Sequence, residues 1–309
     1  MRENGWETAN MSHSPLVHAL GSATHAYEQP TGGWFLNNAG WVTGSERTLL
    51  VDTLATEART AALLAAVRED TGHEGHQLLA AITHWHGDHA HGANQVVNAG
   101  GRIATTGHSA QMISAGPHLF EQVFAYDGWG DVTPPKIELL VSEKTTVDLG
   151  DVSVDLLPVP WTAHTAGDLV VHVPSDGVLF TGDLVFVGVV PLVMAGTAAG
   201  WIQALDWLPT LGHRRLVPGH GPMQGADSTA IADLREYLSW LLDVTAADAP
   251  DFAALDAQAR ERWATWSEGE RHAVNLIKTH ADQHGAEADV TTMAMAMLKP
   301  FGGPIKLDI

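Results

Sequence analysis

The first half of the chain alternates short apolar runs with turn residues, which is the pattern of β-strands. Three such runs near the start are separated by turn signals such as Pro-Thr-Gly-Gly at 30–33. They cover residues 25–29, 34–43 and 48–52. Residues 57–70 follow a helical spacing instead, which Gly72 ends. The apolar side chains on the common face of that helix are Leu63, Leu64 and Val67. The run at 78–82 is too short for a helix and predicts a buried strand.

Strands and helices alternate through the rest of the chain. A helix, a strand and a second helix are predicted at 93–99, at 102–106 and from 109. Residues 117–135 carry four aromatic side chains among glycines and prolines, which predicts an aromatic-rich loop. Short strands, a helix and a last short strand follow at 137–180, 201–211 and 215–217. From 226 to 298 the pattern is helical, with a break at Pro250. Strands mixed with helices in both halves predict a layered α/β fold.

Composition excludes several classes of protein. The chain has 309 residues, which is enough for one large domain or two small ones. It has no cysteine, so disulfides, thiolate metal ligands and cysteine nucleophiles are excluded. No stretch approaches the roughly 18 apolar residues of a membrane span, and the N-terminus lacks the apolar core of a secretion signal. We therefore expect a cytoplasmic protein with no membrane partner.

The formal charge of the chain is −20, because 36 acidic residues outnumber 16 Lys and Arg. A protein that binds nucleic acid needs clustered Lys and Arg on one surface. The chain has no basic run, so nucleic acid is not an expected partner, and the acidity indicates a role in solubility. The few candidates for a local basic patch are Lys136, Lys144, Arg214 and Arg215.

A dense histidine cluster follows the strand predicted at 78–82. His84 and His86 are two positions apart, and alternate residues of an extended chain point to the same side, so both imidazoles can reach one ion. Asp88 and His89 come after Gly87, where the chain can turn, and present an oxygen and a nitrogen to a second point nearby. Zn²⁺ takes this mixture of ligands. The last histidine, His91, is assigned to a helix start or to the surface.

Three later positions can complete two metal sites, which the cluster alone does not. His164 lies just before the strand predicted at 169–173. Asp183 lies just past the end of a strand predicted at 178–181, and His220 follows the strand at 215–217. Each of the three lies near glycines, where an α/β sheet exposes functional side chains.

These motifs resemble those of the metallo-β-lactamase superfamily over residues from about 15 to 245. The resemblance rests on His-Trp-His-Gly-Asp-His at 84–89, His164 before Thr-Ala-Gly, Thr-Gly-Asp ending at Asp183, and Gly-His-Gly around His220. It implies an α/β fold, a four-layer αββα sandwich with a C-terminal helical extension. The implied divisions are a flexible N-terminal tail at 1–14, a catalytic domain at 15–245 and a helical extension packing on it at 246–309.

The resemblance also implies which side chains hold metal. By it, the first ion is held by His84, His86 and His164, and the second by Asp88, His89 and His220, while Asp183 bridges the two. Asp52, at the end of Leu-Leu-Val-Asp, matches a position that supports the site from behind. Many hydrolases of the family read His-Thr-Pro-Gly-His around the third histidine, whereas this chain has Asp168 in the last place. No implied ligand is lost by that difference.

The implied chemistry is hydrolysis with two zinc ions per chain. Two such ions share a hydroxide that attacks an acyl carbon, and they polarise the substrate carbonyl. Asp88 is the candidate catalytic residue, since a carboxylate can orient the water or carry a proton. The chain has no Gly-x-Ser-x-Gly elbow, so a serine hydrolase mechanism of that type is not expected.

The substrate class stays open at this point among a β-lactam, a glutathione thioester, a lactone and a larger thioester. The stretches at 26–42 and 184–206 are similar to a branch of the family that includes bifunctional polyketide cyclase–thioesterases of antibiotic biosynthesis. The leading hypothesis is therefore a thioesterase acting on a small-molecule acyl substrate, delivered by an acyl carrier protein in that branch. A lactonase or generic hydrolase is the alternative, and a metal- or carrier-binding protein without activity is the third. The oligomeric state is left open.

Aromatic side chains near the motifs are the candidates for a substrate pocket. They are Trp34, Trp85, Phe124, Trp129 and Trp161. Aromatic rings of this kind suit a flat acyl group by offset stacking. The C-terminal segment carries Met293 and Met297 four positions apart, which predicts the core side of a helix, with a lid over an apolar substrate as the alternative.

Overall fold

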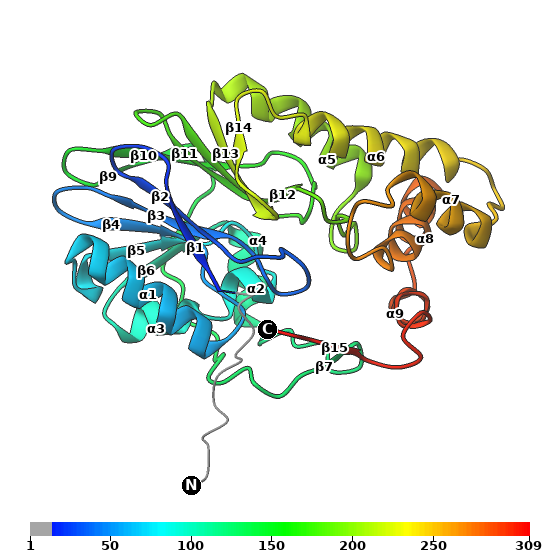
Figure 1. The fold of residues 1–309 in the computed structure, drawn as a ribbon, viewed down its shortest axis with the longest axis horizontal. Helices are drawn as coiled ribbons and strands as arrows, with labels where there is room; N and C mark the ends of the chain where they lie inside the picture. The colour runs from blue at the N-terminus through cyan, green and yellow to red at the C-terminus, as the bar shows by residue number, and fades with distance from the viewer. Residues whose placement is uncertain (1–13) are drawn as a thin grey trace, which may run out of the picture.

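The computed structural model describes residues 14–309, and its strands form two large sheets and one small pair (Figure 1). The predicted tail at 1–14 falls, except for residue 14, outside the described residues. The first sheet has the order β1-β2-β3-β4-β5-β6-β8, and the second has the order β14-β13-β12-β11-β10-β9. The first sheet consists of β1 Leu16–Ala19, β2 Thr24–Glu28, β3 Ala39–Thr43, β4 Thr48–Val51, β5 Leu78–Ala81, β6 Arg102–Thr105 and β8 Leu139–Leu140. The second consists of β9 Thr145–Asp148, β10 Ser153–Pro158, β11 Leu169–Val173, β12 Val178–Phe186, β13 Arg215–His220 and β14 Gln224–Gly225.

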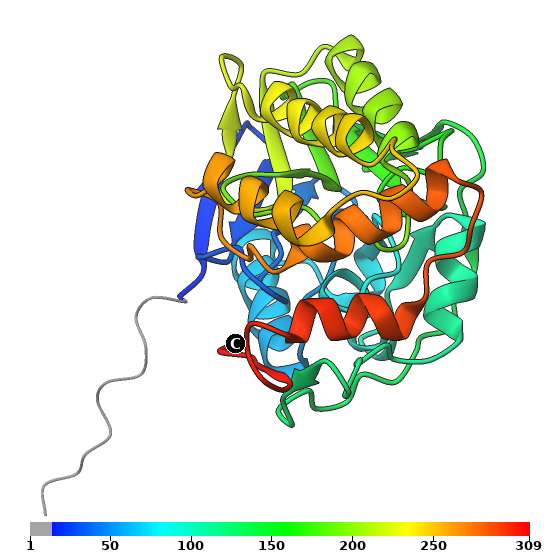
Figure 2. The same cartoon turned by 90° about the vertical axis from the view of Figure 1, so that its right-hand side faces the viewer.

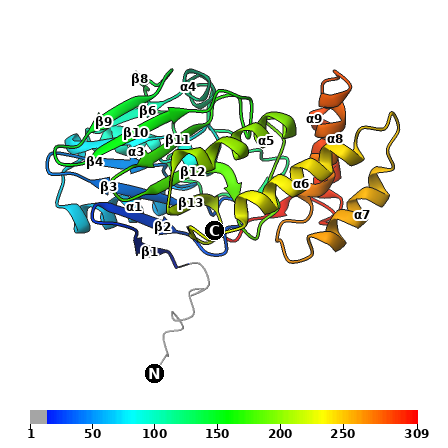
Figure 3. The ribbon, with the colours of Figure 1, turned by 90° about the horizontal axis from the view of Figure 1, so that it is seen from above.

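Helices cover the outer faces of both sheets, as the view from above shows (Figure 3). The first sheet is covered by α1 Glu57–Thr71, α3 Ala93–Asn98 and α4 Gly107–Ser114, with the short α2 Gly87–Ala90 near its edge. The second sheet is covered by α5 Ala198–Trp207 and α6 Ala230–Val244. Two short 3₁₀ turns occupy Gly75–Gln77 and Leu208–Leu211.

Three hydrophobic cores separate the four layers. One lies between α1 and the first sheet and contains Trp41, Leu50 and Leu63. The central core lies between the two sheets, and the third packs α5 and α6 on the second sheet. Successive residues of a strand point to opposite faces, so Leu50 faces the helices while Leu49 faces the other sheet. Strands buried on both faces explain the continuous apolar runs in the sequence. The predicted four-layer α/β sandwich is confirmed.

The chain after α6 forms three more helices along one side of the sandwich (Figure 2). They are α7 Phe252–Arg262, α8 Arg271–Gln283 and α9 Val290–Leu298. After α9, β15 Ile305–Lys306 pairs in parallel with β7 Phe124–Ala125, which belongs to the aromatic-rich loop. A fourth core joins α8 and α9 to that loop, through Val274, Met293 and Met297 on the helices. The C-terminal helical extension therefore shares buried surface with the sandwich.

Local sequence signals account for most element bounds. The side chain of Thr56 accepts a hydrogen bond from the Arg59 backbone at the start of α1, and Gly72 ends that helix with φ 67°. The strand predicted at 34–43 begins only at Ala39, so that prediction was five residues too long. Phe35 has φ 59°, which a strand does not allow. The Asn38 side chain donates instead to the carbonyls of Pro218 and Gly221.

None of the helices within residues 14–309 combines the length and the apolar character that crossing a membrane requires.

Candidate metal centre

The seven predicted ligands come from the ends of strands in both sheets and meet where the two sheets approach each other. His84 and His86 lie on the loop after β5, and α2 carries Asp88 and His89. His164 lies between β10 and β11, and His220 ends β13. Asp183 was predicted just past the end of its strand, but β12 continues to Phe186, so the residue lies inside the strand. The pairing of β12 with β13 shifts register on either side of Gly182, the residue before Asp183.

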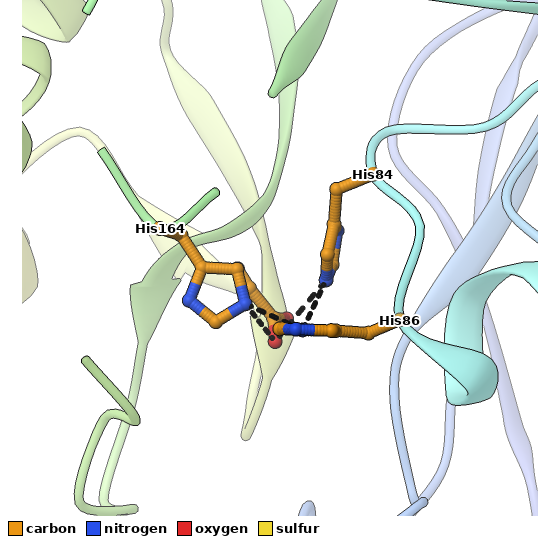
Figure 4. A group of neighbouring side chains, drawn as sticks. His84, His86 and His164 are labelled. Carbon is orange, nitrogen blue, oxygen red and sulfur yellow. Dashed lines mark hydrogen bonds and ion pairs between the residues drawn. The ribbon is translucent and has the colours of Figure 1, made fainter. Parts of the chain in front are cut away.

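The first group consists of Asp183 and three histidines, whose ring nitrogens converge on one point (Figure 4). The Nδ1 atom of His86 lies 3.1 Å from Nε2 of His84 and 2.8 Å from Nε2 of His164. The Oδ2 atom of Asp183 lies 3.6 Å from Nε2 of His84 and 3.3 Å from Nε2 of His164. Tetrahedral ligands about 2.1 Å from a zinc ion lie about 3.4 Å from one another. The first group therefore has the spacing of a tetrahedral nitrogen and oxygen site.

The second group takes the other oxygen of the same aspartate. The Oδ1 atom of Asp183 lies 3.0 Å from Nε2 of His89 and 3.5 Å from Nε2 of His220. Asp88 contributes Oδ2, which lies 3.1 Å from Nε2 of His220. Asp183 thus presents one oxygen to each group, which is the arrangement of a carboxylate that bridges two ions.

Two glycines give Asp183 the space that this arrangement needs. A Cβ on Gly219 would lie 2.0 Å from Oδ1 of Asp183, so any side chain there would displace the carboxylate. Gly182 has φ 50°, and a Cβ on it would meet the Thr83 side chain at 2.5 Å.

The outward nitrogens of two histidines are held by hydrogen bonds. The Nδ1 atom of His89 donates to Oδ2 of Asp52 over 2.8 Å, and that of His220 donates to the Gly32 carbonyl over 2.9 Å. Asp52 also accepts from the backbone N–H and the hydroxyl of Thr83. Each such bond fixes the tautomer that leaves Nε2 free to bind a metal. The structure therefore places Asp52 directly behind the metal ligand His89.

Burial and mutual charge set the pKa values in this centre. Burial lowers the pKa of His84, His86 and His164, that of His86 to about 4, so these rings are neutral at pH 7. Burial also lowers the pKa of His89 and His220, but the carboxylates around these two histidines, Asp183 above all, raise it by more. The pKa of His89 is therefore raised well above its ordinary value, and that of His220 to about 9.

The donor set fits two divalent cations. Neutral imidazole is the form that binds metal, and the three histidines of the first group are neutral at pH 7. In the second group, buried carboxylates raise the pKa of His89 and His220, so this group favours a positive charge. The Nε2 atom of His89 and the Oδ1 atom of Asp183 are buried and form no hydrogen bond within residues 14–309. Groups buried in this way need a partner, and a metal ion at the centre of each group provides it.

The centre lies at one end of a mostly apolar cavity. The cavity wall combines aromatic residues from the sandwich and its loops with apolar residues of α8 and α9. Those residues are Trp34, Phe35, Phe120, Phe124, Phe186, Val274, Met293 and Met297. Both methionines are also buried in the core that joins α9 to the sandwich, so each is a core residue and part of the cavity wall.

Only two of the five predicted pocket aromatics line this cavity, Trp34 and Phe124. Trp85 packs behind His86, with ring centroids 4.4 Å apart. Trp129 is buried behind Phe35, at 4.9 Å between ring centroids. Trp161 packs on Trp207 of α5, away from the cavity wall. These three differ from the prediction because closeness to a ligand in sequence does not fix the side on which a ring packs.

His91 also differs from its prediction. It is buried, with an exposed fraction of 6%, and it stacks on Phe35. Its Nδ1 atom donates to the Ala55 carbonyl over 3.1 Å, so it supports the start of the loop beside the cavity.

Several residues of the cavity wall have no signal in the sequence that would reveal them. Phe186, Leu192 and Met194 reach it from β12 and the loop that follows, and Arg271 is the first residue of α8. The family motifs stop at His220, so a residue on α8 has no motif spacing that would reveal it. The aromatic stacking of Phe186 on His220, at 5.0 Å and 2°, is visible only in three dimensions.

Comparisons with known proteins agree with the fold. The hydroxyacylglutathione hydrolase of Erythrobacter litoralis is 31% identical over 104 residues, which cover 34% of this chain and 32% of that protein. The matched part thus spans about a third of that enzyme's length. The acyl-coenzyme A thioesterase MBLAC2 of Gallus gallus is 27% identical over 214 residues, 62% of this chain and 74% of that protein.

Solved structures share the fold at low sequence identity. A metallo-beta-lactamase from Pontibacter korlensis superimposes with a TM-score of 0.59 at 19% identity, covering 73% of this chain and 99% of that one. The family model described as the metallo-beta-lactamase superfamily matches residues 32–220, a range that contains all seven predicted ligands and more than half of the chain. With that match, the sandwich fold and the two groups of ligands, the chain belongs to the metallo-beta-lactamase superfamily.

Proposed function

We propose that this protein is a dinuclear zinc-dependent hydrolase of thioesters or esters with an apolar acyl group. One observation carries the proposal: two adjoining ligand groups, which share Asp183, lie at the end of a cavity whose other walls are mainly aromatic and aliphatic. A cavity of this kind binds an apolar group by burial and leaves the polar reacting carbon at the ligand groups.

Two bound zinc ions would supply a water that is acidic near pH 7 and a Lewis acid for the substrate carbonyl. The residues of the chain have distinct roles around that chemistry. Asp88 lines the cavity and has a side chain 13% exposed, so its carboxylate can take a proton from the attacking water and pass it to the leaving group. Asp52 holds His89 in one orientation, and the apolar wall excludes bulk water from the acyl group.

The names of two relatives support acyl transfer to water as the reaction class. The matched proteins from Gallus gallus and Erythrobacter litoralis are an acyl-coenzyme A thioesterase and a hydroxyacylglutathione hydrolase. Within that class we propose that the substrate carries an aromatic or polyketide-like acyl group. We propose that hydrolysis of its thioester accompanies closure of a ring in that group. Trp34, Phe120 and Phe124 on the cavity wall support it, because flat rings stack on aromatic side chains.

We propose further that the thioester is presented on a small carrier rather than on an acidic carrier protein. The four cations that suit a local basic patch are already engaged by the chain itself. Lys136 pairs with Glu138 and Lys144 with Asp155, at 2.7 and 2.8 Å. Arg214 and Arg215 donate to the carbonyls of Asp176 and Leu20. A net charge of −20 then repels an acidic protein.

The test compares initial rates of the zinc-loaded protein on an aromatic thioester, an aliphatic lactone and a cephalosporin. We expect hydrolysis of the thioester and no measurable hydrolysis of the cephalosporin. Preference for the lactone would make the protein a lactonase, and preference for the cephalosporin would overturn the thioesterase proposal. The His84→Ala variant serves as the control for contaminating activity, because it loses a ligand of the first group.

A further inference from the structure

Arg271 is a buried cation in the wall of the apolar cavity. Its exposed fraction is 2%, and it is the first residue of α8, outside the segment that carries the family motifs. Its guanidinium lies flat on Trp34, with Cζ 3.8 Å from the ring centroid, so one face is covered. It lines the same cavity as the ligands Asp88 and His220.

The hydrogen-bonding capacity of this guanidinium is only partly used. Its Nη1 donates to the Val190 carbonyl over 2.9 Å. Its Nε is buried and has no acceptor within residues 14–309, and no carboxylate of those residues lies within ion-pair distance of the group. Burying an N–H donor without an acceptor costs about 1–3 kcal/mol, so an incompletely paired guanidinium on a residue that lines a cavity indicates a ligand that carries the acceptor.

The position of Arg271 relative to the metal centre defines where that acceptor would lie. The guanidinium is 5.9 Å from the ring centroid of Phe186, and that ring stacks on the ligand His220 at 5.0 Å. Arg271 is therefore separated from the metal centre by one aromatic ring. When the carbonyl of a substrate reacts at the metal centre, the part of its acyl group that contacts Arg271 would be several bonds from that carbonyl.

The charges around Arg271 favour a neutral acceptor. Glu270 is buried and accepts from Nε1 of Trp34 over 2.6 Å, and Glu268 accepts from the Trp34 backbone N–H. Glu270 and the partly ionised Glu268 lie close to the guanidinium, beyond ion-pair distance, so their negative charge offsets part of its positive charge and opposes a further anion. A ketone or phenol oxygen accepts a hydrogen bond from Arg271 without adding charge.

We propose that Arg271 is a specificity-determining residue, which selects apolar acyl groups that carry a neutral acceptor oxygen several bonds from the scissile carbonyl. This assignment rests on the proposed thioesterase function and names the substrate class within it. A charged donor in an apolar pocket discriminates strongly, because a substrate without the acceptor leaves the donor unpaired.

The test uses three N-acetylcysteamine thioesters of similar length, namely 5-oxo-5-phenylpentanoyl, 5-phenylpentanoyl and 5-(4-carboxyphenyl)pentanoyl. The ketone is remote from the thioester, so the intrinsic reactivity of the three is alike. For the wild-type protein we expect kcat/KM for the ketone to exceed that for the plain chain by about 10- to 100-fold. Arg271→Met should reduce this ratio to near one with little change for the plain chain, and Arg271→Lys should keep part of it.

Arg262→Met on α7 is the matched control, since that arginine is exposed and pairs with Glu236. It should leave all three rates unchanged. A structural role for Arg271, acting only through Val190, would lower every rate by the same factor and leave the ratio intact, which would overturn the assignment. If Arg271→Met fails to fold, a ratio of ketone to plain-chain kcat/KM in Arg271→Lys equal to that of the wild-type protein also refutes the assignment. Preference for the carboxylate would refute the neutral acceptor. No hydrolysis of any of the three by the wild-type protein contradicts the proposed function itself.

Discussion

Replacing Asp52 with Asn is expected to weaken metal binding although the residue is not a ligand. Asn tolerates the backbone at this position, where φ is 60°, and it is nearly the same size as Asp. The carboxylate accepts three hydrogen bonds, two from Thr83 and one from Nδ1 of His89, all within 2.8 Å. An amide has one oxygen and one NH₂ in place of the two oxygens, so it cannot accept all three.

Either orientation of the amide has a cost that the structure allows us to work out. If its oxygen faces His89, its NH₂ meets the Thr83 backbone N–H, and two buried donors face each other. If its NH₂ faces His89, Nδ1 must act as the acceptor, and the ring proton moves to Nε2, the metal-binding atom. Loss of a support of this kind weakens metal binding by about 10- to 100-fold, which is about 1.4 to 2.7 kcal/mol. The unsatisfied donor should lower the free energy of unfolding of the metal-free protein by about 1–3 kcal/mol.

Asp176→Asn provides the control for this substitution. Asp176 is also buried and accepts hydrogen bonds from Ser22, Ala23 and Thr24, but none of its partners touches the metal centre. Both variants should lose stability without metal, as measured by denaturant unfolding. Only Asp52→Asn should lose zinc more readily to a chromogenic chelator in a competition titration. Equal zinc affinity in the two variants would show that Asp52 does not support His89 in metal binding.

Four further predictions can be checked separately. Protein purified without chelator should contain about one to two equivalents of zinc by elemental analysis, and His84→Ala should lose both metal and activity. Asp88→Asn should lose more activity than metal, because the amide keeps a ligating oxygen but takes no proton; equal losses would limit Asp88 to coordination. Burial raises the pKa of Glu268 from 4.5 to about 7, so the folded state holds this proton more tightly than the unfolded state and stability falls as pH rises between those values. In Glu268→Gln, the loss of unfolding free energy between pH 5 and pH 8 should be smaller than in the wild-type protein by about 1–3 kcal/mol. An equal loss in both proteins would contradict the assignment. Tyr237→Phe should lower the free energy of unfolding by about 1–3 kcal/mol, because the hydroxyl meets His272 and Asn275 in a buried network; an unchanged value would mean that the network contributes nothing.

The fold was predictable from the sequence because its signals are local. Apolar runs such as Leu49–Leu50–Val51 are buried on both faces, and the helix at 57–71 has its own cap and its own terminating glycine. The strand predicted at 34–43 was too long because residues before Ala39 use their side chains to hold the loop after β13, a contact between distant parts of the chain.

The grouping of the candidate ligands was predictable for a different reason. Their spacing within a single loop, His84 to His89, restricts where each side chain can point, and the later ligands each stand at a strand next to glycine. The substrate pocket lacks such a restriction. Trp85 and Trp161 are close in sequence to ligands, but each packs on another ring of the fold, and Arg271 reaches the cavity from a helix about 50 residues beyond the last motif.

The cavity is assembled from two stretches of chain, and only the first of them carries candidate ligands. Every predicted ligand lies before residue 221, and Arg271, Val274, Met293 and Met297 all come after residue 270. On the proposed function, substitutions in α8 and α9 would change which acyl group the cavity accepts without replacing a candidate ligand. Selection for a new acyl group could then act on the helical extension, which is tied to the sandwich by a shared core and by the pairing of β15 with β7.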